Sequence, residues 1–437
     1  MPLYRRGQGK NRPPYEQSLG DGLTLRSVRD ERDAQRYVAF FRQHHTHRAA
    51  RTAEELLHHH PATSLDDFLF VEHERTGELV ATTGLIPWHC RYEEATLDVA
   101  QLEMVVARPE YRRRGLIRAQ IQRFHQMALE RGFHLSLIEG IPFYYRQFGY
   151  TYAIDHRGYD SLPVWCIPDV PTGLAGRYAL RPATPEDAPL LTALYREAMA
   201  PLQFAARRDE AYWRFLLERA QYPVRLVERR PDGYAVGYVV TAPLGDQGGL
   251  RVLESAVAER EAGLALLAAL KGESTGEIQL GWPESGTLVQ IGRSLGGAPL
   301  PAYQWLLRIP DVPRLLAAIG PCLERRLAAS PCAGLIADIR LNLYREAFLL
   351  RFQAGKLAGV EPLGFVDSSM GAEGGDLCIP PEAFVRLVTG YRCLGELHDG
   401  WPDIVVKPAI RQVIEILFPR MSSYLCMPYL YLGPLDR

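Results

Sequence analysis

The stretch VAQLEMVVARPEYRRRGLIRAQIQRFH, residues 99–125, decides the fold of the first third of the chain. Its opening, Val99–Ala107, has the apolar and β-branched composition of a buried strand. From Leu116 onward, apolar residues recur at three- and four-residue spacing, which predicts an amphipathic helix that Gly132 is suited to end. A basic loop containing Gly115 therefore joins a strand to the N-terminus of a helix.

Such a loop is suited to bind phosphate. The first turn of a helix has N–H groups without a partner in the helix and carries the positive end of the helix dipole. Gly115 has no Cβ, so the backbone can approach an anion closely, and Arg112 to Arg114 supply charged donors. The two common nucleotide loops, G-x-x-x-x-G-K-[ST] and G-x-G-x-x-G after a strand, are absent. The alternative interpretation is a solvated basic helix start.

The chain also contains an internal repeat. Each copy has a Leu-Arg pair, then an Asp-Ala pair that leads into a helix, then two β-branched runs joined by a turn with glycine, which predicts a hairpin. The two copies predict related units of about 150 residues each, with a boundary near 163–177. The matching segments are Leu25-Arg26 and Leu180-Arg181, Asp33-Ala34 and Asp187-Ala188, 68–71 with 79–82, and 224–227 with 234–240.

A third segment begins near Leu307 and mixes predicted helices with strands, which indicates an α+β domain. The predicted helices are Val312–Arg326, Pro381–Thr389 and Ala409–Leu417, and the predicted strands are Leu335–Leu343 and Phe348–Phe352.

The composition excludes several classes of protein. The 437 residues are 47% hydrophobic and 23% charged, as in soluble globular proteins, and the net charge of −1 argues against a dedicated nucleic-acid binder. No apolar run is long enough to span a membrane, and the basic start, Met1–Pro14, indicates a flexible tail rather than a secretory signal. The seven cysteines show neither zinc-site nor disulfide spacing, so we expect no metal and a cytoplasmic location.

The order Arg-x-x-Gly-x-aliphatic, behind a strand followed by Pro-Glu-Tyr, resembles motif A of the GNAT acetyltransferases, whose loop amides hold the pyrophosphate of coenzyme A. Ile117 departs from that motif, which usually has Gly or Ala there. The run GIPFYYRQFGY, residues 140–150, resembles a GNAT segment that follows the fifth strand, with Gln147 in place of the usual Arg. The whole arrangement, with YRRRGL from Tyr111, resembles the enhanced intracellular survival (Eis) family.

This resemblance implies an α/β (α+β) fold with two tandem GNAT-like domains and a sterol-carrier-protein-like α+β domain. The expected parts are a flexible tail at 1–20, a catalytic GNAT domain at 21–165, a degenerate GNAT-like domain at 176–305 and the C-terminal domain at 306–437. It also implies an N-acetyltransferase that uses acetyl-CoA on a cationic small molecule or lysine-type amine, and a homo-oligomer. The rival is a non-catalytic protein that senses acetyl-CoA or binds a lipid.

The resemblance also assigns residues of this chain to the site. Tyr145 would lie beside the thioester sulfur, while Tyr144, Phe148 and Tyr150 are expected to be core aromatics. The coenzyme-binding residues would be Val105, Val106, Ala107, Arg113, Arg114, Gly115, Leu116, Ile117, Arg118, Gly140 and Ile141.

The residue that removes a proton from the amine has two candidates. In Eis-like enzymes the C-terminal carboxylate is thought to reach the active site, but this chain ends in Arg437 rather than in an aromatic residue. Other GNAT enzymes often place a basic glutamate on the strand before the loop, which is Glu103 here. Glu103 could equally be a charge in a salt bridge, and the sequence does not choose between these candidates.

Two further signals carry less weight. The run Arg260–Ala265 fits Arg-x-x-Gly-x-Ala, but Glu259 and Glu261 would repel a pyrophosphate, so we expect no second coenzyme site. The histidines at 44, 45, 47, 58, 59 and 60 are expected to be solvated or at the lip of the substrate site, because adjacent histidines on a helix point in different directions.

Overall fold

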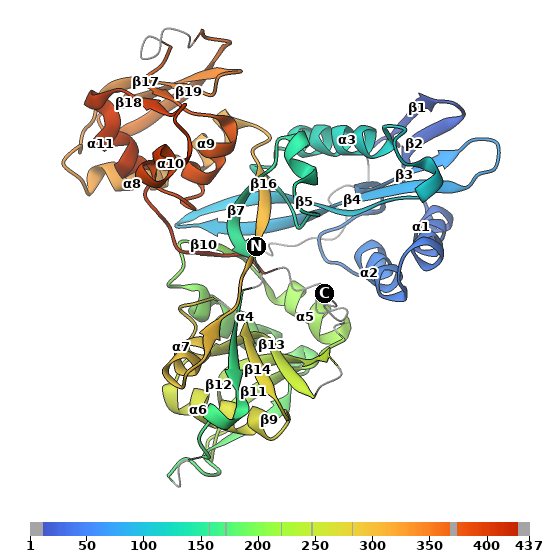
Figure 1. The fold of residues 1–437 in the computed structure, drawn as a ribbon, viewed down its shortest axis with the longest axis vertical. Helices are drawn as coiled ribbons and strands as arrows, with labels where there is room; N and C mark the ends of the chain where they lie inside the picture. The colour runs from blue at the N-terminus through green and yellow to red at the C-terminus, as the bar shows by residue number, and fades with distance from the viewer. Residues whose placement is uncertain are drawn as a thin grey trace.

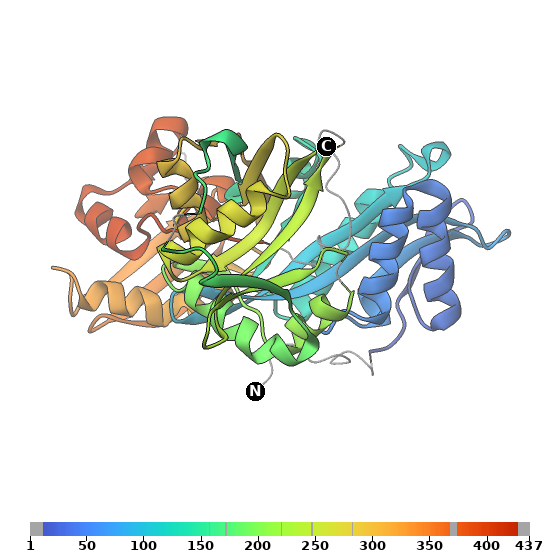
Figure 2. The ribbon, with the colours of Figure 1, turned by 90° about the horizontal axis from the view of Figure 1, so that it is seen from below.

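The computed structural model describes residues 12–156, 158–170, 173–219, 221–245, 248–281, 283–367 and 374–426. These residues form a mixed α/β fold around three sheets, which confirms the predicted fold class (Figure 1). Viewed from below, the blue N-terminal segment lies on one side, the orange-to-red segment lies on the other, and the green-to-yellow segment lies in front between them (Figure 2). In the described residues, no helix is both long and apolar enough to cross a membrane.

The first sheet carries the candidate site. Helices α1 and α2 cover one face and α3 covers the other (Figure 1). Its strand order is β1-β2-β3-β4-β5-β6-β16-β7, with β10 and β22 attached beside β4. The elements of this unit are β1 (Glu16–Gly20), β2 (Leu23–Ser27), α1 (Glu31–His44), α2 (His47–His58), β3 (Phe68–His73), β4 (Leu79–Tyr92), β5 (Ala95–Ala107), α3 (Leu116–Glu130), β6 (Leu135–Ile138), the 3₁₀ helix η3 (Tyr144–Phe148) and β7 (Thr151–His156).

The second sheet repeats the pattern in the order β15-β8-β14-β13-β12-β11-β9. The elements of this unit are β8 (Tyr159–Pro163), β9 (Tyr178–Pro182), α4 (Ala188–Met199), α5 (Glu210–Arg219), β11 (Val224–Arg229), β12 (Tyr234–Leu244), β13 (Gly249–Val257), α6 (Arg260–Lys271), β14 (Glu277–Gly281), α7 (Thr287–Ser294) and β15 (Ala298–Pro299). Between α4 and α5, β10 (Phe204–Ala206) pairs with β4 in the first sheet. Both hairpins that the sequence predicted are formed, by β3 with β4 and by β11 with β12.

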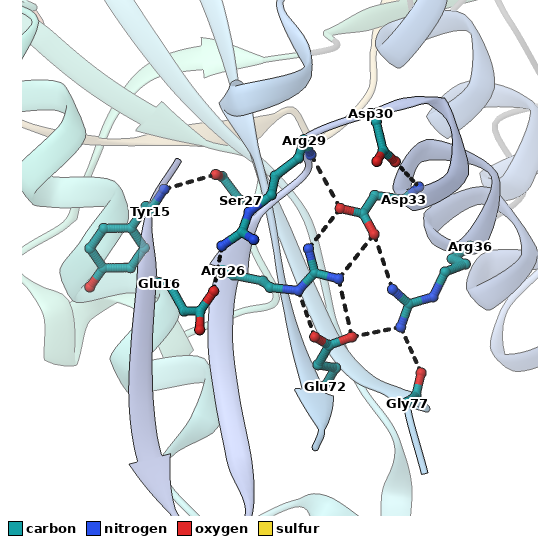
Figure 3. Close-up of polar contacts among 10 residues, drawn as sticks. All are labelled: Tyr15, Glu16, Arg26, Ser27, Arg29, Asp30, Asp33, Arg36, Glu72 and Gly77. Atoms are coloured by element: carbon teal, nitrogen blue, oxygen red, sulfur yellow. Dashed lines mark hydrogen bonds and ion pairs between the residues drawn. The ribbon is translucent and has the colours of Figure 1, made fainter. Parts of the chain in front are cut away.

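The same ion network occurs in both units. In the first unit the guanidinium of Arg26 on β2 contacts Asp33 in α1 at 2.7 Å and Glu72 on β3 at 2.6 Å (Figure 3). In the second unit Arg181 on β9 contacts Asp187 at 2.8 Å and Glu228 on β11 at 2.6 Å. Each arginine follows the same leucine in the repeat, and each network ties a helix start to a hairpin.

The two units exchange a strand with each other. After β7 in the first sheet, the chain crosses over and β8 pairs with β14 in the second sheet. After β15 in the second sheet, the chain returns and β16 (Tyr303–Arg308) inserts between β6 and β7 in the first. Sheet membership therefore changes between β7 and β8 and again between β15 and β16. These points differ from the predicted domain edges at 165 and 305, because local sequence does not show which sheet a strand joins.

The remaining strands and helices form the C-terminal domain around a five-stranded sheet, β19-β18-β17-β20-β21. Its helices and strands confirm those predicted for this segment. At the other end of the chain, β1 pairs with β2, so residues 16–20 belong to the sheet and not to the flexible tail expected at 1–20. The elements of this domain are α8 (Val312–Ala328), β17 (Ala337–Asn342), β18 (Ala347–Gln353), β19 (Lys356–Gly364), β20 (Leu377–Cys378), α9 (Pro381–Val388), α10 (Leu394–Gly400), β21 (Val405–Val406) and α11 (Pro408–Leu417). The last strand, β22 (Ser423–Tyr424), pairs with β10 in the first sheet.

Candidate active site

A β-bulge shapes the end of strand β5. Thr82 of β4 pairs with Val106 and Gly84 with Glu103, so Met104 and Val105 together face a single residue of β4. Met104 has a left-handed backbone with φ of 57°, and such an extra residue bends a strand and takes it locally out of the ladder. Strand β5 pairs with β6 only over Val99–Gln101. In the described residues β5 is not paired with β6 beyond Gln101, and Val105, Val106 and Ala107 line an open slot on that side of the strand.

The basic loop follows the bulged strand and ends at the start of α3, as the sequence predicted. Gly115 directly precedes α3 and has a left-handed φ of 77°, a conformation that favours glycine. A Cβ at Gly115 would meet no atom within 4 Å, so the space above its backbone is open. Arg112, Arg113 and Arg114 are exposed, and the guanidinium of Arg114 lies 5.1 Å from the centre of the Tyr111 ring. The loop thus presents charged donors and free space at a helix N-terminus.

A cavity of about 950 Å³ lies where the slot, the loop and η3 meet. Most of the predicted coenzyme residues line it, as does Tyr145, which the sequence assigned to chemistry. Of the described residues that were predicted, Arg114, Gly140 and Glu103 are not part of this lining. The predicted residues that line the cavity are Val105, Val106, Ala107, Arg113, Gly115, Leu116, Ile117, Arg118, Ile141 and Tyr145.

Tyr145 is held by close packing against Gly140. The Tyr145 side chain is only 6% exposed, and a Cβ on Gly140 would come within 2.1 Å of its ring, so a larger residue at 140 would force the ring to move. The hydroxyl of Tyr303, from the exchanged strand β16, donates to the Gly140 carbonyl oxygen at 2.6 Å. Burial raises the pKa of Tyr145, and the charge of Glu103 raises it further. The phenol is therefore protonated at neutral pH and can act as an acid.

Glu103 lies on strand β5, two residues before Val105, and is half-buried. Its Oε2 accepts a hydrogen bond of 2.7 Å from Nε2 of Gln101, which stands two residues earlier on the same face of β5. Burial raises the pKa of Tyr37 on α1, and the charge of Glu103 adds to that increase. Glu103 is thus near enough to both tyrosines for its charge to act on them.

The second unit holds an equivalent carboxylate in a different state. Counted along the matching ladders, Gly84 opposite Glu103 corresponds to Val240 opposite Glu254. The side chains of Glu254 and Arg208 are both fully buried, and the two form a bidentate ion pair of 2.7 and 2.6 Å. Tyr238 donates a further bond of 2.7 Å to Glu254. A carboxylate held in this way is neutralised and is unsuited to accept a proton.

The second unit also differs at the coenzyme loop. Eight residues, 108–115, connect β5 to α3, whereas only Ala258 and Glu259 connect β13 to α6. The look-alike Arg260–Ala265 lies within α6, where Gly263 is buried and packs against Ile291. Glu259 is engaged by Arg229 at 2.9 Å. Within the residues described for this unit, the pattern therefore builds no phosphate loop.

Sequence reasoning missed one feature of the site and misplaced one histidine. The bulge at Met104 has no local signature, because a methionine seldom adopts a positive φ. His44 and His45 line the cavity at the end of α1, in agreement with the predicted lip, but His60 is fully buried among aromatic rings and not solvated. Arg437 lies outside the described residues.

One group of possible metal ligands occurs among the described residues, and it lies away from the cavity. Glu93, Glu94 and the Cys322 thiol converge there, but Arg325 contacts both carboxylates and Arg326 contacts Glu93 at 3.2 Å. The arrangement already balances its charges as an ion-pair network, so it gives no support for a metal site.

Comparison with known proteins agrees with this geometry. Residues 25–153 match the family model described as "Acetyltransferase (GNAT) domain". The first unit carries a GNAT acetyltransferase domain. No curated protein sequence matches the chain.

Three solved structures share the overall fold. A GCN5-related N-acetyltransferase from Anabaena variabilis has a TM-score of 0.68 at 16% identity, covering 92% of this chain and 99% of that one. A GCN5-related N-acetyltransferase from Kribbella flavida has a TM-score of 0.64 at 20% identity, covering 92% and 99%. Eis1 from Mycobacterium abscessus has a TM-score of 0.62 at 18% identity, covering 92% and 98%. At these identities the likeness shows the fold alone.

Proposed function

We propose that this chain is an N-acetyltransferase that moves the acetyl group of acetyl-CoA to an amine in the cavity of the first unit. One observation carries the proposal: the Gly115 loop, the bulged end of β5 and Tyr145 meet around a single cavity of about 950 Å³. Phosphate binding, an extended slot and a proton donor are the three things that a thioester donor of this kind needs.

The donor side fits the residues present. The start of α3 offers backbone N–H groups for the pyrophosphate, and Arg113 and Arg118 add charged donors from the lining. Val105, Val106 and Ala107 line the slot, where their backbone groups would bind the amides of the pantetheine arm. An N–H group at Val106 is suited to polarise the acetyl oxygen as charge develops there.

The proton transfers fall to the two side chains beside the cavity. A lysine-like amine has a pKa of about 10.4, so it is mostly protonated at neutral pH and must lose a proton before it attacks. We assign that proton to Glu103, directly or through one water. The amine nitrogen then bonds to the acetyl carbon as the carbon–sulfur bond breaks, and Tyr145 gives its proton to the departing sulfur. The surplus proton on the acylated nitrogen passes to the Tyr145 oxygen, directly or through water, and Glu103 releases its proton to solvent, so both side chains return to their starting states. The products are the acetylated amine and the free thiol of coenzyme A.

The contrast between the units supports Glu103 as the base. Its counterpart Glu254 is clamped by Arg208, whereas Glu103 is hydrogen bonded by the neutral amide of Gln101. The carboxylate of Arg437 stays the alternative proposal. The acceptor class, a cationic small molecule or a lysine-type amine, also stays a proposal, as do the cytoplasmic location, the homo-oligomer and the sterol-carrier-like character of the C-terminal domain.

The decisive assay follows the release of the coenzyme thiol from acetyl-CoA with a panel of amines. We expect turnover with at least one cationic amine, and we expect Tyr145→Phe to reduce it. Tight coenzyme binding without turnover on any amine would instead favour the non-catalytic rival. Glu103→Gln compared with deletion of Asp436 and Arg437 then identifies the base, since only one of the two changes should abolish turnover in a folded protein.

A further inference from the structure

A short chain of hydrogen bonds runs from the interior of the first unit to Glu103. The indole Nε1 of Trp88 on β4 donates to Oε1 of Gln101 at 2.8 Å, and Nε2 of Gln101 donates to Oε2 of Glu103 at 2.7 Å. Trp88 is fully buried and Gln101 is 1% exposed. The Trp88–Gln101 bond is therefore shielded from water, and the Gln101–Glu103 bond is partly buried.

Trp88 determines which way the hydrogen bonds in this series point. An indole N–H is a donor and never an acceptor, so Trp88 selects the amide orientation in which the Gln101 oxygen faces it. The Gln101 NH₂ must then face Glu103. A donor at that place favours the ionised carboxylate, which is the form that accepts a proton. The bond also fixes the direction in which the carboxylate points.

Trp88 is in turn packed against the second unit. The ring of Tyr212 on α5 lies 5.4 Å from the Trp88 ring. His60, at the end of α2, is fully buried and lies 5.5 Å from Tyr212, 5.5 Å from Phe215 and 6.0 Å from Trp88. Burial lowers the pKa of His60 to about 3, so the ring is neutral at physiological pH. Two aromatic residues of α5, Tyr212 and Phe215, thus complete a cluster of rings around Trp88, where the hydrogen-bond chain begins.

We propose that Gln101 is a positioning residue for the base Glu103, and that Trp88, held by α5 of the second unit, fixes the amide of Gln101. This inference rests on the proposed function, in which Glu103 removes the proton from the amine. It gives the second unit a role in catalysis although that unit builds no coenzyme loop. Its helix α5 supports the base across the boundary between the units.

The matched test compares two glutamines. Gln101→Met keeps the length of the side chain but removes both hydrogen bonds. We expect kcat to fall about tenfold to a hundredfold, as for a misplaced reacting group, with the KM for acetyl-CoA unchanged. Gln279 on β14 makes a similar pair of bonds, accepting from Arg251 at 3.0 Å and donating to Glu277 at 3.0 Å. Gln279→Met should leave kcat unchanged.

A pH profile separates positioning from a merely structural effect. The acidic limb of the kcat profile should move to higher pH in Gln101→Met, because the ionised carboxylate has lost a donor. Tyr37 and Tyr145, the tyrosines whose pKa values Glu103 raises, stay protonated across that range and do not contribute to the limb. Wild-type kcat together with an unshifted acidic limb would overturn the proposal.

Two further variants keep the test open if Gln101→Met does not fold. Trp88→Phe keeps a ring but removes the N–H, and we expect a loss in kcat of about threefold to tenfold because the Gln101 amide can then reverse. Tyr212→Ala should lower kcat with KM unchanged, and Tyr212→Phe should restore it. If Trp88→Phe keeps full kcat, the amide needs no such support and the proposal is wrong.

The assignment of Glu103 as the base and the positioning role of Gln101 can be refuted separately. If Glu103→Gln keeps full activity, the assignment of Glu103 is wrong and the positioning role falls with it. If Glu103→Gln abolishes turnover while Gln101→Met and Trp88→Phe both keep wild-type kcat and pH profile, Glu103 stands and only the positioning role is refuted.

Discussion

The two repeated units share a scaffold and differ at the points where chemistry would occur. Both hold a helix start to a hairpin through an arginine and two carboxylates, Arg26 in one and Arg181 in the other. In the first unit eight residues form the loop between β5 and α3, whereas in the second unit only two residues lie between β13 and α6. The first leaves Glu103 beside a neutral amide, and the second clamps Glu254 with Arg208. The two units therefore share a scaffold, and we propose that the loop and the partner of one carboxylate determine which unit can react.

The largest expected effect lies at the carboxylate of the first unit. Glu103→Gln removes the group that accepts the proton, and general base catalysis contributes about 10²- to 10⁴-fold to a rate. We expect kcat to fall within that range while the KM for acetyl-CoA changes little. Steady-state kinetics by thiol release measures both, and a kcat within twofold of wild type would contradict the assignment.

The same substitution in the second unit should act on stability instead. Glu254→Gln leaves the buried guanidinium of Arg208 without its partner, and breaking a buried pair lowers the free energy of unfolding by about 3–5 kcal/mol. Turnover should fall only in proportion to the loss of folded protein. Denaturant unfolding followed by activity per folded molecule tests this, and a specific loss of kcat would give Glu254 a role that the comparison denies it.

The two arginine motifs offer the next contrast. Arg113→Gln combined with Arg114→Gln should raise the KM for acetyl-CoA about tenfold to a hundredfold, since hydrogen bonds to a charged group contribute about 1.5–3 kcal/mol. Arg260→Gln should change nothing, because Arg260 lies at the start of α6 with no phosphate loop before it. Equal effects from the two changes would show that the second unit binds coenzyme as well.

The smallest expected effect concerns the shared scaffold. Arg26 is 12% exposed and Arg181 is 39% exposed, so solvent screens the second network more. We expect Arg26→Met to lower the free energy of unfolding by about 2 kcal/mol and Arg181→Met by less than about 1 kcal/mol. Equal losses of unfolding free energy in the two variants would show that the difference in burial does not change how much each network stabilises the fold.

The pH dependence of these networks has a definite sign. Burial raises the pKa of Asp33, but the hydrogen bonds and charge of Arg26 outweigh it and lower the pKa overall. Arg181 lowers the pKa of Asp187 to about 2. A carboxyl whose pKa is lower in the folded state stabilises the fold above its unfolded pKa, and that stability is lost as the pH falls through the folded value. The difference between each arginine variant and wild type should therefore shrink below about pH 4.

Much of the first unit could be predicted from sequence because its signals are local. The apolar run before residue 107, the glycine at 115 and the helical spacing after it each reflect a conformation that neighbouring residues determine. The repeat was equally visible, since the Leu-Arg and Asp-Ala pairs mark the same network twice. The charges of Glu259 and Glu261 argue against a phosphate loop at Arg260–Ala265, and the structure adds that this run lies within helix α6.

The features that escaped prediction depend on residues distant in sequence. Nothing near β8 or β16 tells which sheet each strand joins, because that choice follows from pairing across the whole chain. The bulge at Met104 depends on the register between β4 and β5. The link from Trp88 to Glu103 joins two strands and a helix of the other unit. The sequence could therefore propose Glu103 but could not say what holds it.

The stoichiometry of acetyl-CoA binding tests the central claim most directly. Titration of the wild-type chain by calorimetry should give one acetyl-CoA per chain, and the combined change of Arg113 and Arg114 to glutamine should weaken that one event about tenfold or more. Two acetyl-CoA molecules per wild-type chain, or a single event of unaltered affinity in the variant, would contradict the claim that only the first unit holds the coenzyme.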